Sequence, residues 1–225
     1  MIRALTIAVL LLLSFLMNSC ASSGSRDEKP AVTIHRLPES HPVTADLRPP
    51  REREVTQALR RVFGGALLMD SSANSRFLVG DFNGDDSPDL VVVVRPRAGG
   101  LSVVNSELAN WIVTDPHKTA LPPAGARVAR LPSRTSRELV QADEQLVAVI
   151  HGFGPAGWRD PNARQAYLLR KVAGQAMSLH PVQPLEFPRN ALISHSQAIH
   201  ETVAGQAGAL YWTGFNYRWQ LLPKS

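Results

Sequence analysis

The segment from Val79 to Val92 constrains the fold most, because it has the pattern of a strand, a tight acidic loop and a second, wholly apolar strand. Oxygen-bearing groups recur at alternate positions of the loop, four from side chains and one from a main-chain carbonyl: Asp81, Asn83, Asp85, Asp89 and the carbonyl of Ser87. Calcium takes about six to eight oxygen ligands at flexible angles. The spacing therefore predicts a calcium-binding loop.

A second interpretation of the same residues needs no metal. Asn and Asp side chains hydrogen-bond their own backbone in tight turns, so the loop could be a hairpin turn stabilised in that way. The loop is not an EF-hand, because Val92 stands at position 12, where that motif requires a bidentate glutamate. Its flanks also have strand patterns, whereas an EF-hand loop joins two helices.

From Gly80 to Val94 the sequence resembles the FG-GAP and VCBS-type repeat, in which a strand–loop–strand unit holds calcium. The resemblance implies these side-chain ligands: Asp81, Asn83, Asp85 and Asp89. The chain departs from the family at Asp86, where a glycine is usual. The motif occurs once, whereas a propeller needs at least about four blades of roughly 40 residues. We therefore expect one domain with a single such loop, not a full propeller.

The rest of the chain from residue 51 onward predicts an α+β domain, mainly antiparallel sheet with one N-terminal amphipathic helix. The helix is expected over 51–64, where apolar residues recur at helical spacing between Pro50 and Gly65. Strands are expected at Arg76–Gly80, Asp89–Arg95, Leu101–Asn105, Asn110–Thr114, Gln145–His151, Gln165–Val172 and Met177–His180, followed by a hairpin from Ala209 to Leu222. Ser194–Val203 fits a helix or a strand.

Residues 1–19 have the anatomy of a signal peptide. A short positive start precedes the apolar run Ala4–Met17, which is shorter than the roughly 20 residues of a membrane-spanning helix. The box that ends in Ser19-Cys20 resembles a bacterial lipoprotein signal, which implies that Cys20 is acylated and begins the mature protein. By resemblance to the sorting rule of such lipoproteins, the absence of aspartate after Cys20 implies the outer membrane, where the cell has one. The alternative is cleavage after Ala21, which would release a free secreted or periplasmic protein.

Cys20 is the only cysteine, so the chain cannot form an intramolecular disulfide. The segment 20–50 is rich in serine, proline and charge, which is typical of a flexible tether. The sequence thus predicts three parts: a signal peptide at 1–19, a tether at 20–50 and a single β-rich domain at 51–225.

The formal net charge of +5 comes from basic residues scattered along the chain. Nucleic-acid binders usually cluster them on one face, often with stacking aromatic rings, so we expect no nucleic-acid partner. Weak attraction to anionic envelope lipids is compatible with this charge. The expected partners are the membrane, through the lipid anchor, and a protein of the cell envelope.

An enzyme interpretation rests on His151. The segment Val149–Gly154 resembles the His-Gly oxyanion strand of α/β-hydrolases, but the chain lacks the G-x-S-x-G nucleophile motif of those enzymes. The histidines also lack the spacing of an HExxH or zinc site. The aromatic residues near the C-terminus fit either a sheet core or a sugar- or peptide-binding platform, and the core is favoured: Tyr211, Trp212, Phe215, Tyr217 and Trp219.

Taken together, these patterns predict a membrane-anchored envelope lipoprotein that acts as a non-enzymatic interaction or structural module and is stabilised by calcium. The first alternative is an envelope hydrolase that uses the His151 region. The second is a free secreted protein in which the acidic loop is purely structural.

Overall fold

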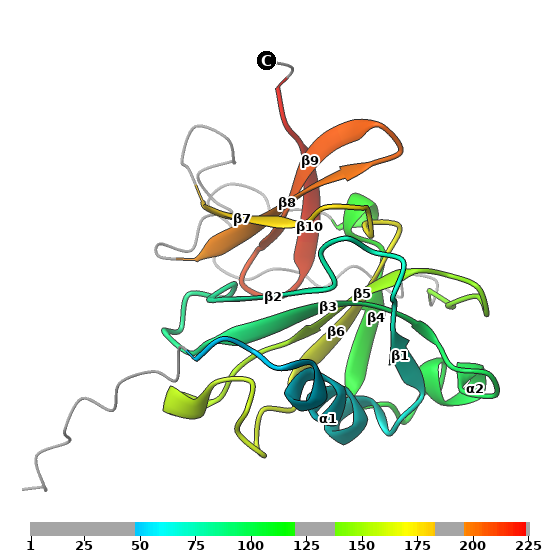
Figure 1. The fold of residues 1–225 in the computed structure, drawn as a ribbon. Helices are drawn as coiled ribbons and strands as arrows, with labels where there is room; N and C mark the ends of the chain where they lie inside the picture. Colours follow the sequence, from blue (N-terminus) through cyan, green and yellow to red (C-terminus); the bar gives the residue numbers. More distant parts are fainter. Residues whose placement is uncertain (1–47, 120–137, 183–195, 224–225) are drawn as a thin grey trace, which may run out of the picture. The chain divides into compact units, whose positions relative to one another are not determined.

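The computed structural model describes residues 48–119, 138–182 and 196–223, all of which belong to one compact unit (Figure 1). The predicted signal peptide, Cys20 and the tether as far as residue 47 lie outside the described residues. The described part is mostly β-structure, with two mainly antiparallel sheets and few helices. The predicted dominance of antiparallel sheet is therefore confirmed, and neither described sheet closes into a barrel.

Helix α1 spans Glu52–Phe63, within the range where the sequence predicts a helix. Its first turn is closed by the backbone N–H of Arg51, which donates to the Glu54 carboxylate at 3.1 Å. Gly64 ends the helix in the left-handed conformation, with φ of 61°, which glycine adopts without steric cost. One face of α1 is buried through these side chains: Val55, Ala58, Leu59 and Phe63.

The first sheet has six described strands: β1 (Leu67–Met69), β2 (Phe77–Gly80), β3 (Asp89–Pro96), β4 (Trp111–Thr114), β5 (Leu146–Ile150) and β6 (Ala166–Arg170). Their order is β1-β3-β5-β6-β4, and β2 also pairs with β3. β1 and β2 pair with opposite ends of β3, since Met69 lies opposite Val94 and Phe77 opposite Val92. Only the β4–β6 pairing among these described strands is parallel.

The second sheet is an antiparallel set of four described strands in the order β10-β9-β8-β7. These strands are β7 (Ser178–Pro181), β8 (Gln197–Val203), β9 (Gln206–Trp212) and β10 (Tyr217–Leu221). β8 settles the open choice at Ser194–Val203, because its described residues form a strand. β9 and β10 make the predicted C-terminal hairpin, and the described residues 178–180 of the strand predicted at Met177–His180 lie in β7.

The central strands of the first sheet are buried on both faces, which explains their unbroken apolar sequence. In β3, Leu90, Val92 and Val94 pack in the same cluster as the buried face of α1. The alternate residues Val91 and Val93 pack against side chains of the second sheet. Helix, first sheet and second sheet are thus three layers with two apolar interfaces, and period-2 alternation assigns each β3 side chain to one of them.

The strand predicted at Leu101–Asn105 is wrong. The segment forms the one-turn helix α2, Leu101–Val104, in which the N–H of Val104 donates to the Gly100 carbonyl at 3.0 Å. The β-branched valines suggested a strand. The preceding Gly99 has φ of 75°, and the turn that it permits leads directly into the helix. β1 was not predicted, because a three-residue strand is too short to show an alternating pattern.

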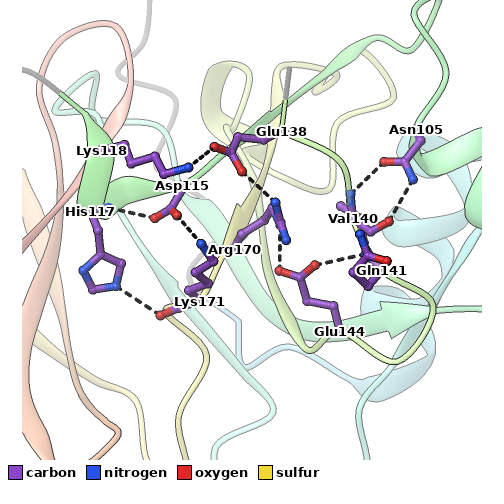
Figure 2. A network of polar contacts seen from close by, with 10 residues as sticks. All are labelled: Asn105, Asp115, His117, Lys118, Glu138, Val140, Gln141, Glu144, Arg170 and Lys171. Atoms are coloured by element: carbon purple, nitrogen blue, oxygen red, sulfur yellow. Dashed lines mark hydrogen bonds and ion pairs between the residues drawn. The ribbon is translucent and has the colours of Figure 1, made fainter. Parts of the chain in front are cut away.

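A polar network joins segments on either side of residues 120–137 (Figure 2). Arg170, at the end of β6, contacts Glu138 at 2.6 Å and Glu144 at 2.7 Å, and all three side chains are less than one-fifth exposed. Lys118, which ends the short 3-10 helix Pro116–Lys118, contacts the other oxygen of Glu138 at 2.6 Å. The guanidinium of Arg170 therefore neutralises two largely buried carboxylates at once.

We predict that Arg170→Met lowers the free energy of unfolding by about 2–3 kcal/mol, because it leaves Glu138 and Glu144 largely buried without their shared cation. Lys118→Met is the matched control. The Lys118 side chain is 63% exposed, so its loss should cost less than about 1 kcal/mol. Urea denaturation of both variants measures the difference, and equal losses would contradict the structural role assigned to Arg170.

Candidate functional site

The acidic loop joins β2 to β3, and its flanks are strands, as the sequence predicts. The two strands pair antiparallel up to Gly80 opposite Asp89, so the loop closes a hairpin. Gly84 and Asp86 both have positive φ, of 76° and 64°. Asp86 therefore holds the left-handed conformation at the position where the sequence departs from the glycine of the repeat that it resembles, and Asp tolerates this conformation better than most residues.

The carboxylate of Asp81 organises the loop backbone. One oxygen, Oδ1, accepts the N–H of Gly84 at 2.7 Å and that of Asp85 at 3.3 Å. The other, Oδ2, accepts the N–H of Asp86 at 2.9 Å. These bonds satisfy amides that would otherwise require water, and they turn the chain around the carboxylate.

Asn83 and Asp85 converge on the same place. The N–H of Asp85 lies 3.1 Å from Oδ1 of Asn83, and the Asn83 side-chain amide donates to Oδ2 of Asp85 at 2.8 Å. Oδ1 of Asp85 accepts the N–H of Ser87 at 2.9 Å. The side chains of Asp81 and Asn83 thus both contact the backbone N–H of Asp85, and Asn83 also contacts the Asp85 carboxylate. Three of the predicted ligands therefore lie close together.

Asp89 is fully buried and connects the loop to a distant segment. Its Oδ2 accepts the N–H of Phe82 at 2.8 Å, and its Oδ1 accepts the N–H of Gly152 at 2.6 Å. Burial raises the pKa of Asp89 to about 8, and the charges of Asp85 and Asp81 act in the same direction, against the two amide donors, which lower it. A cation among these carboxylates would favour the ionised form.

Ser87 and Pro88 form hydrogen bonds that join the loop to the segment after β5. The Ser87 hydroxyl donates to the Gly154 carbonyl at 2.7 Å, and the Pro88 carbonyl accepts the N–H of Trp158 at 2.7 Å. Gly152 lies so close to the Pro88 carbonyl oxygen that a Cβ atom there would collide with it. The glycine after His151 therefore permits a close approach of two backbones.

Gln197 of β8 connects the loop to the second sheet. Its backbone N–H donates to the Asp81 carbonyl at 2.7 Å, and its side-chain oxygen accepts the N–H of Asp81 at 3.0 Å. Sequence reasoning missed this contact, because 116 residues separate the partners and glutamine at a strand start carries no signal for a remote loop. The acidic loop thus contacts both sheets and the segment after β5.

The donor chemistry of the loop fits calcium, which prefers carboxylate and amide oxygens. Asp81, Asn83 and Asp85 are half-buried or exposed and could be reached by an ion. The described residues hold no group of three His, Cys, Asp or Glu side chains arranged for one metal ion. Calcium here would therefore also depend on Asn83 and on main-chain carbonyls such as that of Ser87. Asp89 is buried and is the least accessible of the predicted side-chain ligands. Each of its carboxylate oxygens accepts one N–H and keeps a second lone pair that could bind an ion.

His151, the residue behind the hydrolase alternative, is 1% exposed and lies among aromatic rings. Its Nε2 lies 2.8 Å from the Tyr217 hydroxyl. The ring centroids of Trp212 and Tyr167 are 4.9 and 5.2 Å from that of the imidazole. Burial lowers the pKa of His151 to about 4, against smaller opposing effects of Asp85 and Gln165. The imidazole is therefore neutral at pH 7 and enclosed by the interface between the sheets.

The C-terminal aromatic residues are mainly core residues. Tyr211, Trp212, Tyr217 and Trp219 are each at most 7% exposed, whereas Phe215 at the hairpin turn is 40% exposed. The rings of Trp212, Tyr217 and Trp219 face the first sheet. The favoured core interpretation therefore describes four of the five rings, and Phe215 alone among them is open to solvent.

Comparisons with protein-family models, with curated proteins and with solved structures find no match to this chain. Within the described residues, no helix is both long enough and apolar enough to cross a bilayer.

We predict that His151 makes the fold sensitive to acid. The unfolded histidine takes up a proton near pH 6.5 and the folded one only near pH 4, so folding stability falls as the pH drops through this window. Relative to His151→Gln, which cannot titrate, the wild type should lose about 3 kcal/mol between pH 7 and pH 4.

Urea denaturation at several pH values provides the measurement. The difference between wild type and variant is the informative quantity, because Asp89, with its pKa raised to about 8, changes stability in the opposite direction and is common to both chains. Parallel pH profiles for the two chains would show that His151 is not held neutral by burial.

Proposed function

We propose that this chain is a lipid-anchored protein of a bacterial cell envelope whose folded part is a non-enzymatic interaction or structural module. In this proposal the loop Asp81–Asp89 binds calcium weakly, through Asp81, Asn83, Asp85, Asp89 and the carbonyl of Ser87. The ion would contribute no chemistry beyond neutralising charge and cross-linking the loop. Cys20 would hold the chain at the membrane, in the outer membrane facing the periplasm.

The position of the loop is the observation that carries the calcium proposal. Through Asp89, Ser87 and Pro88 the loop contacts the segment after β5, and through Asp81 it contacts β8 of the second sheet. An ion that fixed the loop side chains would therefore stabilise the contact between three parts of the fold. It would also relieve the repulsion that the buried Asp89 experiences from Asp81 and Asp85.

The burial of His151 supports the non-enzymatic proposal over the hydrolase alternative. A general base must come within about 3 Å of the proton that it removes, directly or through one water. The His151 ring is instead packed against Tyr167, Trp212 and Tyr217, and its Nε2 contacts the Tyr217 hydroxyl. These contacts support a role in holding the two sheets together.

We predict that calcium raises the melting temperature of the wild type. With a dissociation constant of about 10⁻⁴–10⁻³ M, about 10 mM calcium would contribute roughly 1.4–2.7 kcal/mol, or about 5 °C for a domain of this size. Asp85→Asn should abolish most of the shift, because it removes one of the carboxylates while keeping the side-chain volume.

Two controls accompany the melting experiment. Asp160→Asn removes a carboxylate from another turn, where Asp160 accepts the N–H of Asn162 at 2.8 Å, and should leave the calcium shift intact. Magnesium at the same concentration should shift the melt less, since it demands a stricter octahedral site. A wild-type melt that is unchanged by millimolar calcium, with no heat in a calorimetric titration, would leave the loop as a turn stabilised by its own Asn and Asp.

We also predict that the mature chain begins at an acylated Cys20. Mass spectrometry of the membrane-extracted protein should show the lipid on this residue, and Cys20→Ser should allow a high-salt wash to remove the protein from the membrane fraction. Ser19→Thr, which keeps a small residue before the cysteine, serves as a control and should remain membrane-bound. A mature N-terminus at Ala21 or Ser22 without lipid would instead support the secreted alternative.

A further inference from the structure

A shallow groove of about 290 Å³ lies between α1 and the edge of the first sheet formed by β1 and the end of β3. Its α1 side includes Glu52 and Arg60, and its sheet side includes Leu68, Arg95 and Arg97. The three arginines come from segments up to 37 positions apart, since Arg60 lies on the helix and Arg97 follows β3. The fold thus gathers them beside one groove, which no run of basic residues in the sequence indicates.

The groove carries an excess of positive charge. Arg60, Arg95 and Arg97 are exposed, and none of them forms an ion pair with another described residue. Glu52 is the one acidic residue among those that line the groove, and its carboxylate lies 3.6 Å from the guanidinium of Arg76, a fourth cation close by. Arginine forks match the oxygens of phosphate groups, so the groove suits an anionic, phosphate-bearing ligand.

Two other carboxylates belong to the segments that form the groove walls. Asp70, which feels the charge of Arg95, is 5% exposed, and its oxygens already accept from Ser72 and Gln145. Glu54 lies on α1, and its carboxylate accepts the N–H of Arg51 and contacts Arg159. Both acids are therefore engaged within the fold, which leaves the arginines of the groove available to an outside anion.

An apolar side chain accompanies the charge. Leu68 is 46% exposed and lies directly opposite Arg95 in the β1–β3 pairing. The next residue along β1, Met69, lines the same groove and is half-buried. An exposed leucine beside exposed arginines suits the boundary between lipid headgroups and acyl chains, where apolar groups enter and cationic groups stay at the phosphates.

The groove also lies where the predicted tether ends. Glu52, the first residue of α1, lines it, and the proposed acylation site Cys20 is 32 positions earlier in the chain. A flexible segment of about 30 residues has an end-to-end distance of roughly 30 Å. An anchored chain would therefore keep this part of the fold within a few tens of ångströms of a lipid surface.

We propose that the groove between α1 and β1 docks onto the anionic phosphate headgroups of the membrane that carries the anchor. The orientation of the folded part is then set by Arg60, Arg95 and Arg97 at the headgroups, with Leu68 directed to the bilayer. This inference rests on the proposed lipid anchor. The contact gives the tethered module one preferred face toward the bilayer.

The test uses the chain from residue 20 onward with Cys20→Ser, so that no acyl chain contributes to binding. Co-sedimentation compares neutral phosphatidylcholine vesicles with vesicles that contain about 30% phosphatidylglycerol, at low and at physiological salt. Binding should require the anionic lipid and weaken with salt. Arg60→Gln and Arg95→Gln should each reduce the partition coefficient about fivefold, and the triple variant with Arg97→Gln on the order of 100-fold.

Two controls separate the groove from net charge. Arg164→Gln removes an exposed arginine that does not line the groove, and it should change the partition coefficient less than twofold. Replacement of all three groove arginines by lysine keeps the charge but removes the planar forks, so it should weaken binding, though by less than the triple glutamine variant. Thermal melts of each variant confirm that the fold is intact.

The outcomes distinguish this inference from the anchoring proposal. Vesicle binding by the Cys20→Ser chain with the expected arginine dependence supports the groove, whether or not Cys20 is acylated in cells. Equal losses for Arg164→Gln and Arg60→Gln, or equal binding to neutral and anionic vesicles, would overturn it even if Cys20 carries a lipid. Arginine-dependent binding to a single-stranded oligonucleotide, with none to vesicles, would overturn it as well.

Discussion

The carboxylate of Asp89 is the polar contact on which the arrangement of the described residues most depends. It lies at the start of β3, a strand whose apolar residues pack on both faces, and accepts one N–H from its own loop and another from Gly152, 63 positions away. A buried carboxylate is unfavourable unless its oxygens are satisfied. The two amides therefore restrict where the loop and the segment after β5 can lie, and Gly152 and Pro88 meet there because no side chain intervenes.

Around this carboxylate the chain combines a mainly apolar interface with one that contains a buried polar pair. On the α1 side of β3 the packed residues are aliphatic and aromatic. On the other side, the paired His151 and Tyr217 lie between the sheets near the acidic loop. Burial raises the pKa of Tyr217 well above its usual value, and the nearby Asp89 adds to this effect. His151 and Tyr217 therefore both stay neutral at physiological pH, and their mutual hydrogen bond is retained.

Local patterns in the sequence predict much of this fold. Patterns that extend over only a few residues predict α1 from its apolar stripe and terminal glycines, and β3 from its apolar run. Both elements lie where these patterns place them. The strand expected at Leu101–Asn105 fails because β-branched residues cannot reveal that Gly99 and Gly100 start a helical turn. The acidic loop is visible in the sequence, whereas its distant contacts are not. The contact with Gln197 depends on how the two sheets pack, and the contact with Gly152 depends on the pairing of β3 with β5. The grouping of Arg60 with Arg95 and Arg97 is also hidden, because it depends on how α1 packs against the first sheet.

The burial of β3 on both faces has a consequence for the chain before it folds. Leu90 to Val94 is a five-residue run of leucine and valine, with high β-propensity and no charge, which is the composition of segments that self-associate when exposed. Asp89 and Arg95 stand at its two ends, as charged residues commonly flank such segments in natural proteins. In an unfolded chain Asp89 is ionised at neutral pH and keeps like segments apart. Before folding, the charge of Asp89 thus opposes association of this apolar segment with other chains. After folding, the same side chain is buried in the interior.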